Sequence, residues 1–220
     1  MLDKSDRKAH HKPVMPSDAQ LNSQIRQAAR EVAAGGDASD RTFALARLYD
    51  LTADRLVRFA ASITRRQHDA EDAVSTTMLK VASRPRLLVG AKRPWHYLLR
   101  MVRNESLVIL RSRSRWSTIG SIAERLTGRS SDVVERDDEN RKVWEALASL
   151  PGPQSEVVVL KIWEQMTFAE IAEVLEITPS TAASRYRYAL EKLSSKLSRV
   201  SPQGHASGED ASQSLAEVAR

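Results

Sequence analysis

The stretch TFAEIAEVLEITPSTAASRYRYALEKLSSKL, residues 167–197, decides the fold because it predicts two short helices joined by a tight turn. Thr167 and Glu170 have the spacing of a capping box, in which each side chain accepts a hydrogen bond from the backbone of the other residue. Thr178 as N-cap and Pro179 at the first helical position then mark the start of a second helix. Two short helices and such a turn are typical of a helix-turn-helix.

The second helix has two chemically different faces. Apolar residues recur at helical spacing along one face, namely Ala182, Ala183, Tyr186, Leu190, Leu193 and Leu197. The other face and its flanks carry hydroxyls, arginines and a tyrosine, namely Ser180, Thr181, Ser184, Arg185, Arg187 and Tyr188. Such a face fits the major groove of DNA, where hydroxyl and guanidinium groups bond base edges and phosphates. An ordinary helical hairpin with a solvated basic face is the alternative.

The turn departs from the usual pattern at Glu176, which stands where glycine is common. A non-glycine residue in the left-handed conformation costs roughly 1–2 kcal/mol. The sequence therefore leaves open a turn that is bent differently from the usual one.

The composition is typical of a globular protein, and the net charge favours a polyanionic partner. The 220 residues are 41% hydrophobic and 28% charged, and they contain no run of 18 apolar residues that could span a membrane. The absence of cysteine excludes disulfides, thiolate metal sites and thiol nucleophiles, and it fits a reducing cytoplasm. The N-terminus has no apolar signal-peptide core, so we expect a cytoplasmic protein. A net charge of +6 favours nucleic acid as the partner.

The N-terminal half predicts several helices after a disordered tail, residues 1–16. His10 and His11 in this tail supply too few donors for a metal, and no metal or cofactor is expected. A helix capped by Ser17 or Asp18 runs to Gly35–Gly36, and a second runs from about residue 40 to 66, with a small break near residues 51–52 left open.

The next predicted helix carries a polar surface. Asp69 is its expected N-cap, and Arg84–Pro85 ends it. Four residues lie off its apolar stripe, and these are Glu71, Asp72, Ser75 and Thr76. Acidic residues in a first turn complement the helix dipole, which by itself explains this surface.

Basic charge is concentrated between Lys92 and Trp116. Seven basic residues stand against the single acid Glu105, a surplus of +6 that equals the charge of the whole chain. Aromatic residues, Trp95 among them, are interspersed with the arginines, as on surfaces that hold unstacked bases and phosphates. A helix with core aromatics and a solvated basic rim is the alternative.

The composition of residues 117–138 is typical of a linker. Beyond it we expect helices over 141–150 and 155–164, the helix-turn-helix, and a disordered tail over residues 200–220. The predicted architecture is thus all-α, with one helical domain over 17–116 and a second over 139–199 joined by a flexible linker.

Three segments together resemble the extracytoplasmic-function (ECF) subfamily of sigma-70 sigma factors of bacterial RNA polymerase. DAEDAVSTTMLKV (69–81) resembles the family's polymerase-binding helix, and YLLRMVRNESLVILRSRSR (97–115) resembles its −10 helix. The stretch from Leu150 to Leu193 resembles its C-terminal DNA-binding domain. The sequence departs from the family's common residues at Ser75, Tyr97, Val108, Gln165 and Glu176.

The resemblance implies a non-enzymatic factor that binds core polymerase through the β′ clamp helices and the β flap, acts as a monomer in that complex, and directs promoter-specific initiation. Glu71, Asp72, Ser75 and Thr76 would then form a docking surface for polymerase. The −10 element would meet Lys92, Arg93, Trp95, Arg100, Arg103, Asn104 and Arg111. The −35 element would meet Ser180, Thr181, Ser184, Arg185, Arg187 and Tyr188. An anti-sigma factor is a possible further partner.

Two other function classes compete with this interpretation. A helix-turn-helix regulator that acts without core polymerase would explain the C-terminal domain but leave the basic and acidic helices unused. An enzyme is disfavoured because Glu71 and Asp72 diverge by about 100° on a helix and cannot form a two-carboxylate metal clamp alone.

Overall fold

The computed structural model describes residues 18–119 and 138–200, and every element within these two ranges is an α-helix. In chain order the helices are α1 (Asp18–Ala33), α2 (Ala38–Thr64), α3 (Gln67–Ser83), α4 (Arg86–Val89), α5 (Pro94–Ile119), α7 (Asp138–Ala148), α8 (Gly152–Ile162), α9 (Phe168–Leu175) and α10 (Pro179–Val200). The all-α prediction is confirmed. The predicted tails and most of the predicted linker lie outside the described residues. No helix within the described ranges has the length and apolarity needed to cross a bilayer.

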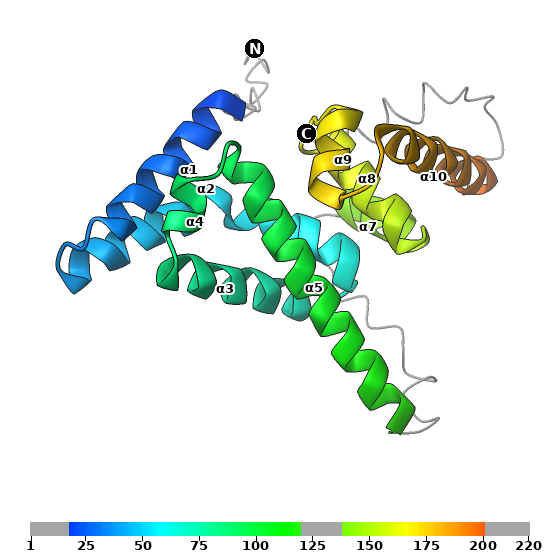
Figure 1. The fold of residues 1–220 in the computed structure, drawn as a ribbon. Helices are drawn as coiled ribbons and strands as arrows, with labels where there is room; N and C mark the ends of the chain where they lie inside the picture. The colour runs from blue at the N-terminus through cyan, green and yellow to red at the C-terminus, as the bar shows by residue number, and fades with distance from the viewer. Residues whose placement is uncertain (1–17, 120–137, 201–220) are drawn as a thin grey trace, which may run out of the picture.

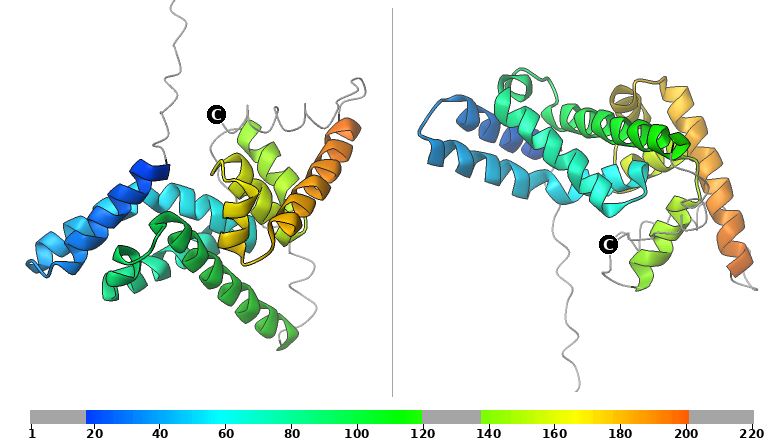
Figure 2. Two further views of the ribbon diagram at one scale, coloured as in Figure 1. Left: turned by 45° about the horizontal axis from the view of Figure 1, so that its top comes forward. Right: turned by 90° about the horizontal axis from the view of Figure 1, so that it is seen from below.

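Helices α1 to α5 form one packed unit, called here the N-terminal group. Helix α2 lies at its centre and packs against α1, α3 and α5 (Figure 1). The side chains of Leu48, Leu56 and Phe59 on α2 are fully buried. Burial of each such side chain contributes about 1.5–3 kcal/mol, so α2 contributes substantially to the apolar stabilisation of this group. The second half of α5 extends away from the group (Figures 1 and 2).

The predicted helix boundaries are largely confirmed, with two corrections. Helix α1 stops before Gly35, whose φ of +75° is accessible to glycine at little cost. Helix α2 is continuous, so the break that the sequence left open near residues 51–52 does not occur; Thr52 is buried there, and its hydroxyl donates to the Leu48 carbonyl at 2.7 Å. The expected capping role of Asp69 is wrong. Helix α3 begins at Gln67 with Arg66 as its N-cap, three residues before the predicted cap, and Asp69 accepts a hydrogen bond from Arg113 at 2.8 Å instead.

Helices α7 to α10 form the C-terminal group. Helix α8 contributes the apolar centre, with four consecutive buried residues from Val157 to Leu160. Trp144 on α7 stacks on Trp163 just after α8, with ring centroids 6.2 Å apart. Helix α5 runs to Ile119, and α7 begins at Asp138.

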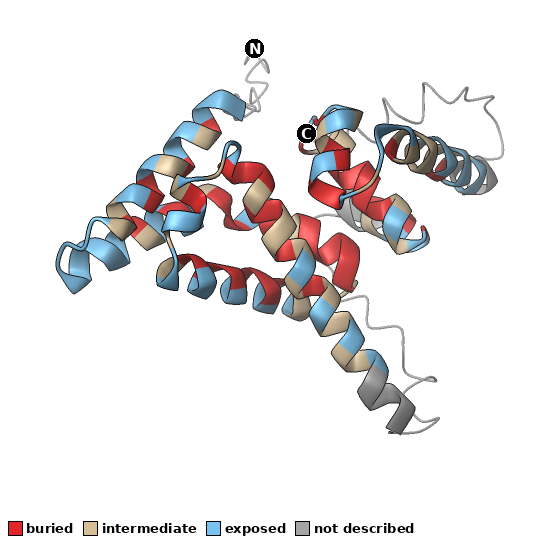
Figure 3. Cartoon of the chain, in the orientation of Figure 1, coloured by how far each residue is buried: buried red, intermediate tan, exposed pale blue. Residues whose placement is uncertain are grey.

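The two groups lie side by side. Helix α8 packs against α2, and α9 packs against α5. Side chains along the N-terminal half of α5 are mostly buried, whereas α3 is buried only on the side that faces α2 and α5 (Figure 3). The outer face of α3 is therefore available to solvent.

Candidate nucleic-acid interface

The helix-turn-helix consists of α9, a short turn and α10. The capping box at its start is complete, because Glu170 Oε2 accepts from the Thr167 amide at 2.9 Å and Thr167 Oγ1 accepts from the Glu170 amide at 3.3 Å. Glu176 ends α9 in the left-handed conformation, with φ 56° and ψ 47°. The turn therefore keeps the left-handed residue that glycine usually supplies, and a glutamate bears the strain.

Helix α10 starts as the sequence predicts. The hydroxyl of Thr178 accepts from the Thr181 amide at 3.1 Å, which is the expected N-cap. Ala182 and Leu193 from the predicted apolar face are buried, and Ala189 joins them. Ala189 lies one turn beyond Tyr186, at the i+3 position, so its helical spacing identifies it in retrospect.

The predicted groove-facing side chains of α10 lie on the surface of the described chain. Ser180, Arg187 and Tyr188 are exposed, and Thr181, Ser184 and Arg185 are half-buried. The guanidinium of Arg187 lies 5.1 Å from the centroid of the Tyr188 ring, which holds the two side chains together. The hydroxyl of Thr178 bonds those of Ser180 and Thr181 at 2.9 and 2.8 Å. This end of α10 thus presents a compact set of hydroxyls beside arginines.

The polar and basic residues assigned to the −10 element divide into two sets. Lys92, Asn104 and Arg111 are exposed to solvent. The other three face the C-terminal group and form ion pairs with it. These pairs are Arg93 with Glu170, Arg100 with Glu176 and Arg103 with Glu156, at nitrogen–oxygen distances of 3.0, 3.6 and 2.6 Å.

The assignment of Trp95 to a DNA-facing surface needs correction, because this side chain is fully buried. Its backbone N–H donates to Asn22 Oδ1 at 2.9 Å, and its indole N–H donates to Glu164 Oε2 at 3.2 Å. The guanidinium of Arg55 lies 4.4 Å from the ring centroid. Trp95 is thus a core aromatic, as in the alternative that the composition left open.

Glu164 is a buried acid that sequence reasoning missed. It lies between α8 and α9, its side chain is fully buried, and both Arg55 on α2 and Trp95 on α5 donate to its Oε2. Charged residues are almost never fully buried unless they are paired. The position after the apolar run of α8 gives no sign of this, because the partners come from more than 65 residues away.

The polar surface of α3 is exposed as predicted, since Glu71, Asp72, Ser75 and Thr76 all face solvent. Leu79 is also 69% exposed on this side of the helix, and sequence reasoning missed it. It follows Glu71 and Ser75 at successive intervals of four residues, which places the three on one face. The α3 surface therefore joins acidic and hydroxyl groups to an exposed leucine.

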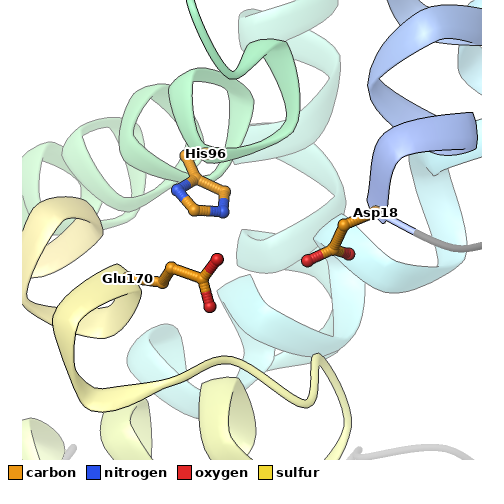
Figure 4. Close-up of side chains that lie close together, drawn as sticks. All are labelled: Asp18, His96 and Glu170. Carbon is orange, nitrogen blue, oxygen red and sulfur yellow. The ribbon is translucent and has the colours of Figure 1, made fainter.

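A histidine lies where α1, α5 and α9 meet. Figure 4 shows the imidazole of His96 directed toward the carboxylates of Asp18 and Glu170, and one ligand-type atom from each of the three lies within 4.8 Å of the others. Burial lowers the pKa of His96, more than the carboxylate of Glu173 raises it. The oxygens of Glu170 accept from Thr167 and Arg93, and the cation of Arg93 beside them disfavours a metal ion. The cluster is therefore part of a contact network between the two groups, in which Arg93 forms ion pairs with Glu170 and Glu173.

The same network holds Glu170 ionised. Burial alone would raise the pKa of this carboxyl, but hydrogen bonds from Thr167 and the charges of Arg93 and His96 together hold it below the usual range.

Two family models match the chain. The model described as sigma-70 region 2 matches residues 48–115, which span most of α2 to α5, and the model described as sigma-70, region 4 matches residues 140–193, which span α7 to α10. The three surfaces described above lie within these two matches.

Curated relatives and solved structures agree with the family models. The ECF RNA polymerase sigma factor SigL of Mycobacterium tuberculosis is 30% identical over 149 residues, which cover 66% of this chain and 84% of the relative. The RNA polymerase sigma-E factor of Streptomyces coelicolor is 26% identical over 66% of this chain and 80% of its own length.

Two solved structures share the fold at 22% identity. The sigma factor RpoE of Bartonella quintana, in complex with the anti-sigma factor NepR, has a TM-score of 0.58 and matches 68% of this chain and 93% of its own. CnrH, in complex with the cytosolic domain of CnrY, has a TM-score of 0.54 and matches 80% of this chain and 98% of its own.

The helix-turn-helix, the basic helix and the α3 surface thus occur together in a chain whose two matched regions and relatives have one family in common. The chain belongs to the ECF subfamily of the sigma-70 family and is a sigma factor that binds core RNA polymerase and directs promoter-specific initiation of transcription.

Proposed function

We propose that this sigma factor divides its task among three surfaces. The α3 surface (Glu71, Asp72, Ser75 and Thr76) docks on the β′ clamp helices of polymerase. The basic face (Lys92, Arg93, Arg100, Arg103, Asn104 and Arg111) holds the −10 element. The recognition face of α10 (Ser180, Thr181, Ser184, Arg185, Arg187 and Tyr188) reads the −35 element.

The observation that carries this division is the separation of the three chemistries on three helices. Acids and hydroxyls with an exposed leucine occupy α3, arginines with an asparagine occupy α5, and hydroxyls beside arginines occupy α10. Guanidinium groups bind phosphates and guanine edges, whereas a carboxylate repels DNA, so α3 suits a protein partner and the other two suit DNA.

We further propose the domain limits 17–116 and 139–199, with the second domain also contacting the β flap. The protein acts without catalysis, as a monomer in the holoenzyme, and in the cytoplasm. An anti-sigma factor is a proposed further partner, because the solved structure of the sigma factor RpoE, which shares this fold, contains one.

Run-off transcription with core polymerase on a promoter library tests the proposal. Arg185→Ala should abolish selection of the preferred promoters, because it removes a groove-facing guanidinium, while binding to core polymerase is retained. Lys196→Ala, on the same helix but outside the recognition face, is the matched control and should select the same promoters as the parent chain. Unchanged promoter choice in Arg185→Ala would contradict the assignment of this face.

A further inference from the structure

All five acidic residues between Gly152 and Thr178 form ion pairs with the N-terminal group. These glutamates, called here the glutamate face, are Glu156, Glu164, Glu170, Glu173 and Glu176. Their partners are arginines of α2 and of the segment that includes α5. An ordinary solvated helix surface places acids toward water in several directions, whereas here every acid of this stretch is directed to one partner surface.

The partner arginines overlap the proposed DNA-binding set. Arg93, Arg100 and Arg103 belong to the basic face, and each of them contacts a glutamate of the C-terminal group. A guanidinium that pairs with a carboxylate uses the same donors with which it would pair with a phosphate. We call the packing of the C-terminal group against the N-terminal group the closed arrangement. In it, three of the six residues of the basic face are paired with carboxylates.

Burial separates the ion pairs into inner and outer ones. The inner pairs are Glu164 with Arg55, at 0% and 13% side-chain exposure, and Glu156 with Arg103, at 6% and 18%. Arg93 and Arg100 are more exposed, at 47% and 34%. A DNA phosphate cannot reach the Arg103 guanidinium while α8 covers it, so DNA and the closed arrangement exclude each other there.

The contacts between the two groups leave some polar atoms without a hydrogen-bond partner. Glu164 Oε1, Ser155 Oγ and Arg100 Nε are buried without a hydrogen-bond partner. Each such atom costs free energy that water or another ligand recovers when the two groups separate. Buried ion pairs also contribute little net stability, because the charges lose their hydration. This interface suits reversible closure.

We propose that the glutamate face masks the basic face in the free chain, with its carboxylates in the places that promoter phosphates take after opening. The proposal rests on the assignment of the basic face given above. The α3 surface and the exposed part of the recognition face remain open in the closed arrangement. Polymerase docking and duplex contact are thus compatible with closure, whereas −10 binding requires the two groups to separate.

Energy transfer between two dyes measures closure directly. The chain has no cysteine, so Ser83→Cys on α3 and Ser195→Cys on α10, both exposed, give two unique labelling sites. The latch variant combines Glu156→Gln with Glu164→Gln. The control combines Asp50→Asn with Asp54→Asn, which removes the same charge from exposed positions of α2. Fluorescent oligothymidine measures the binding of single-stranded DNA to the parent chain, the latch variant and the control.

The latch variant should lose energy transfer and bind oligothymidine at least about tenfold more tightly than the control, because an open state populated at 10% or less reduces apparent affinity by that fraction. An equal increase in oligothymidine affinity in the latch variant and in the control would mean that the loss of negative charge alone explains the increase, and it would overturn the proposal. Unchanged energy transfer in the latch variant would overturn it as well.

A charge exchange tests the same contact independently, in case the latch variant does not fold. Arg103→Glu and Glu156→Arg should each reduce energy transfer alone, and the two together should restore it, because the pair reforms with reversed charges. Failure of the double variant to recover energy transfer would overturn the proposal.

Adding Arg103→Ala to the latch variant tests the role of Arg103 in DNA binding separately from closure. Oligothymidine affinity should then fall, because the freed guanidinium is lost. Unchanged affinity would refute the assignment of Arg103 to the basic face, and masking of that residue with it, while energy transfer still reports closure independently.

Discussion

At the scale of single residues, backbone strain is concentrated at three non-glycine positions. Arg65, Gln165 and Glu176 have φ values of 62°, 54° and 56°, and Arg65 and Glu176 end helices α2 and α9. Glycine would adopt this conformation without a steric penalty. Two of the three side chains make contacts between the groups: Arg65 donates to the Leu147 and Leu150 carbonyls, and Glu176 pairs with Arg100. Local strain thus accompanies long-range contacts.

Replacing Glu176 by glycine should stabilise the fold. The left-handed conformation costs a non-glycine residue roughly 1 kcal/mol or more, and the 3.6 Å pair with Arg100 is too exposed to offset this. We expect the melting temperature of Glu176→Gly to rise by about 2–4 °C. Glu176→Ala loses the same carboxylate but keeps the Cβ, so it should show no increase. A lower melting temperature for the glycine variant than for the alanine variant would contradict the strain argument.

His96 should make stability depend on pH. Burial lowers its pKa in the folded chain, so between that value and the unfolded value of about 6.5 the unfolded chain binds more protons. Stability therefore falls as pH decreases through this window, with a slope of up to about 1.4 kcal/mol per pH unit. The facing groups are Glu170 and Glu173 on α9, Asp18 on α1 and Arg93 beside α5.

Urea unfolding at pH 7.5 and pH 5.5 checks the His96 prediction. His96→Gln should lose less stability than the parent chain between the two values, while the exposed His68→Gln should behave like the parent. The same loss in His96→Gln as in the parent would mean that another group titrates.

At the scale of elements, α3 shows how one helix serves both the core and a partner. Its inner residues Ala73, Val74 and Val81 are fully buried, and the outer residues that include Asp72 are solvated. Change on the outer face should therefore affect binding without affecting folding.

Reversing the charge at Asp72 should weaken polymerase binding. We expect Asp72→Lys to lose at least about tenfold in affinity for core polymerase, because a lysine is repelled by the cationic surface that the carboxylate meets. The contact of Asp72 with His68 is long, at 3.7 Å, and exposed, so the helical content should not change. Asp50→Lys, an equal reversal on the exposed side of α2, should bind polymerase normally. If the two variants bound core polymerase with equal affinity, the acidic residues of the α3 surface would serve only to complement the helix dipole.

At the scale of the whole molecule, salt should open the chain in two stages. The outer pairs of Arg93 and Arg100 are exposed and are screened as the Debye length falls from about 10 Å at 0.1 M to about 3 Å at 1 M salt. The inner pair of Glu164 with Arg55 resists screening because it is buried. The radius of gyration from small-angle X-ray scattering should therefore rise with salt, and at lower salt in Glu164→Gln than in the parent. A radius that stays constant in both proteins would contradict ionic closure.

Local physics explains which features the sequence predicted well. Helix starts and stops depend on residues within one turn, so Thr167 with Glu170, Thr178 and Gly35 were identified correctly. The exposure of the α3 surface was predicted from the helical spacing of the apolar residues alone. Asp69 was misassigned because its partner Arg113 lies 44 residues away, and Trp95 because its neighbours come from three other segments.

The sequence by itself determined the all-α class, most of the helices, the helix-turn-helix and the concentration of positive charge, because each of these depends on spacing within a short window. Only the tertiary structure decided which charges meet. It placed Glu164 beneath Arg55 and Glu156 against Arg103, although 109 and 53 residues separate these partners along the chain. Electrostatic pairing acts through space and depends on which surfaces the packed helices bring together, which no local pattern specifies.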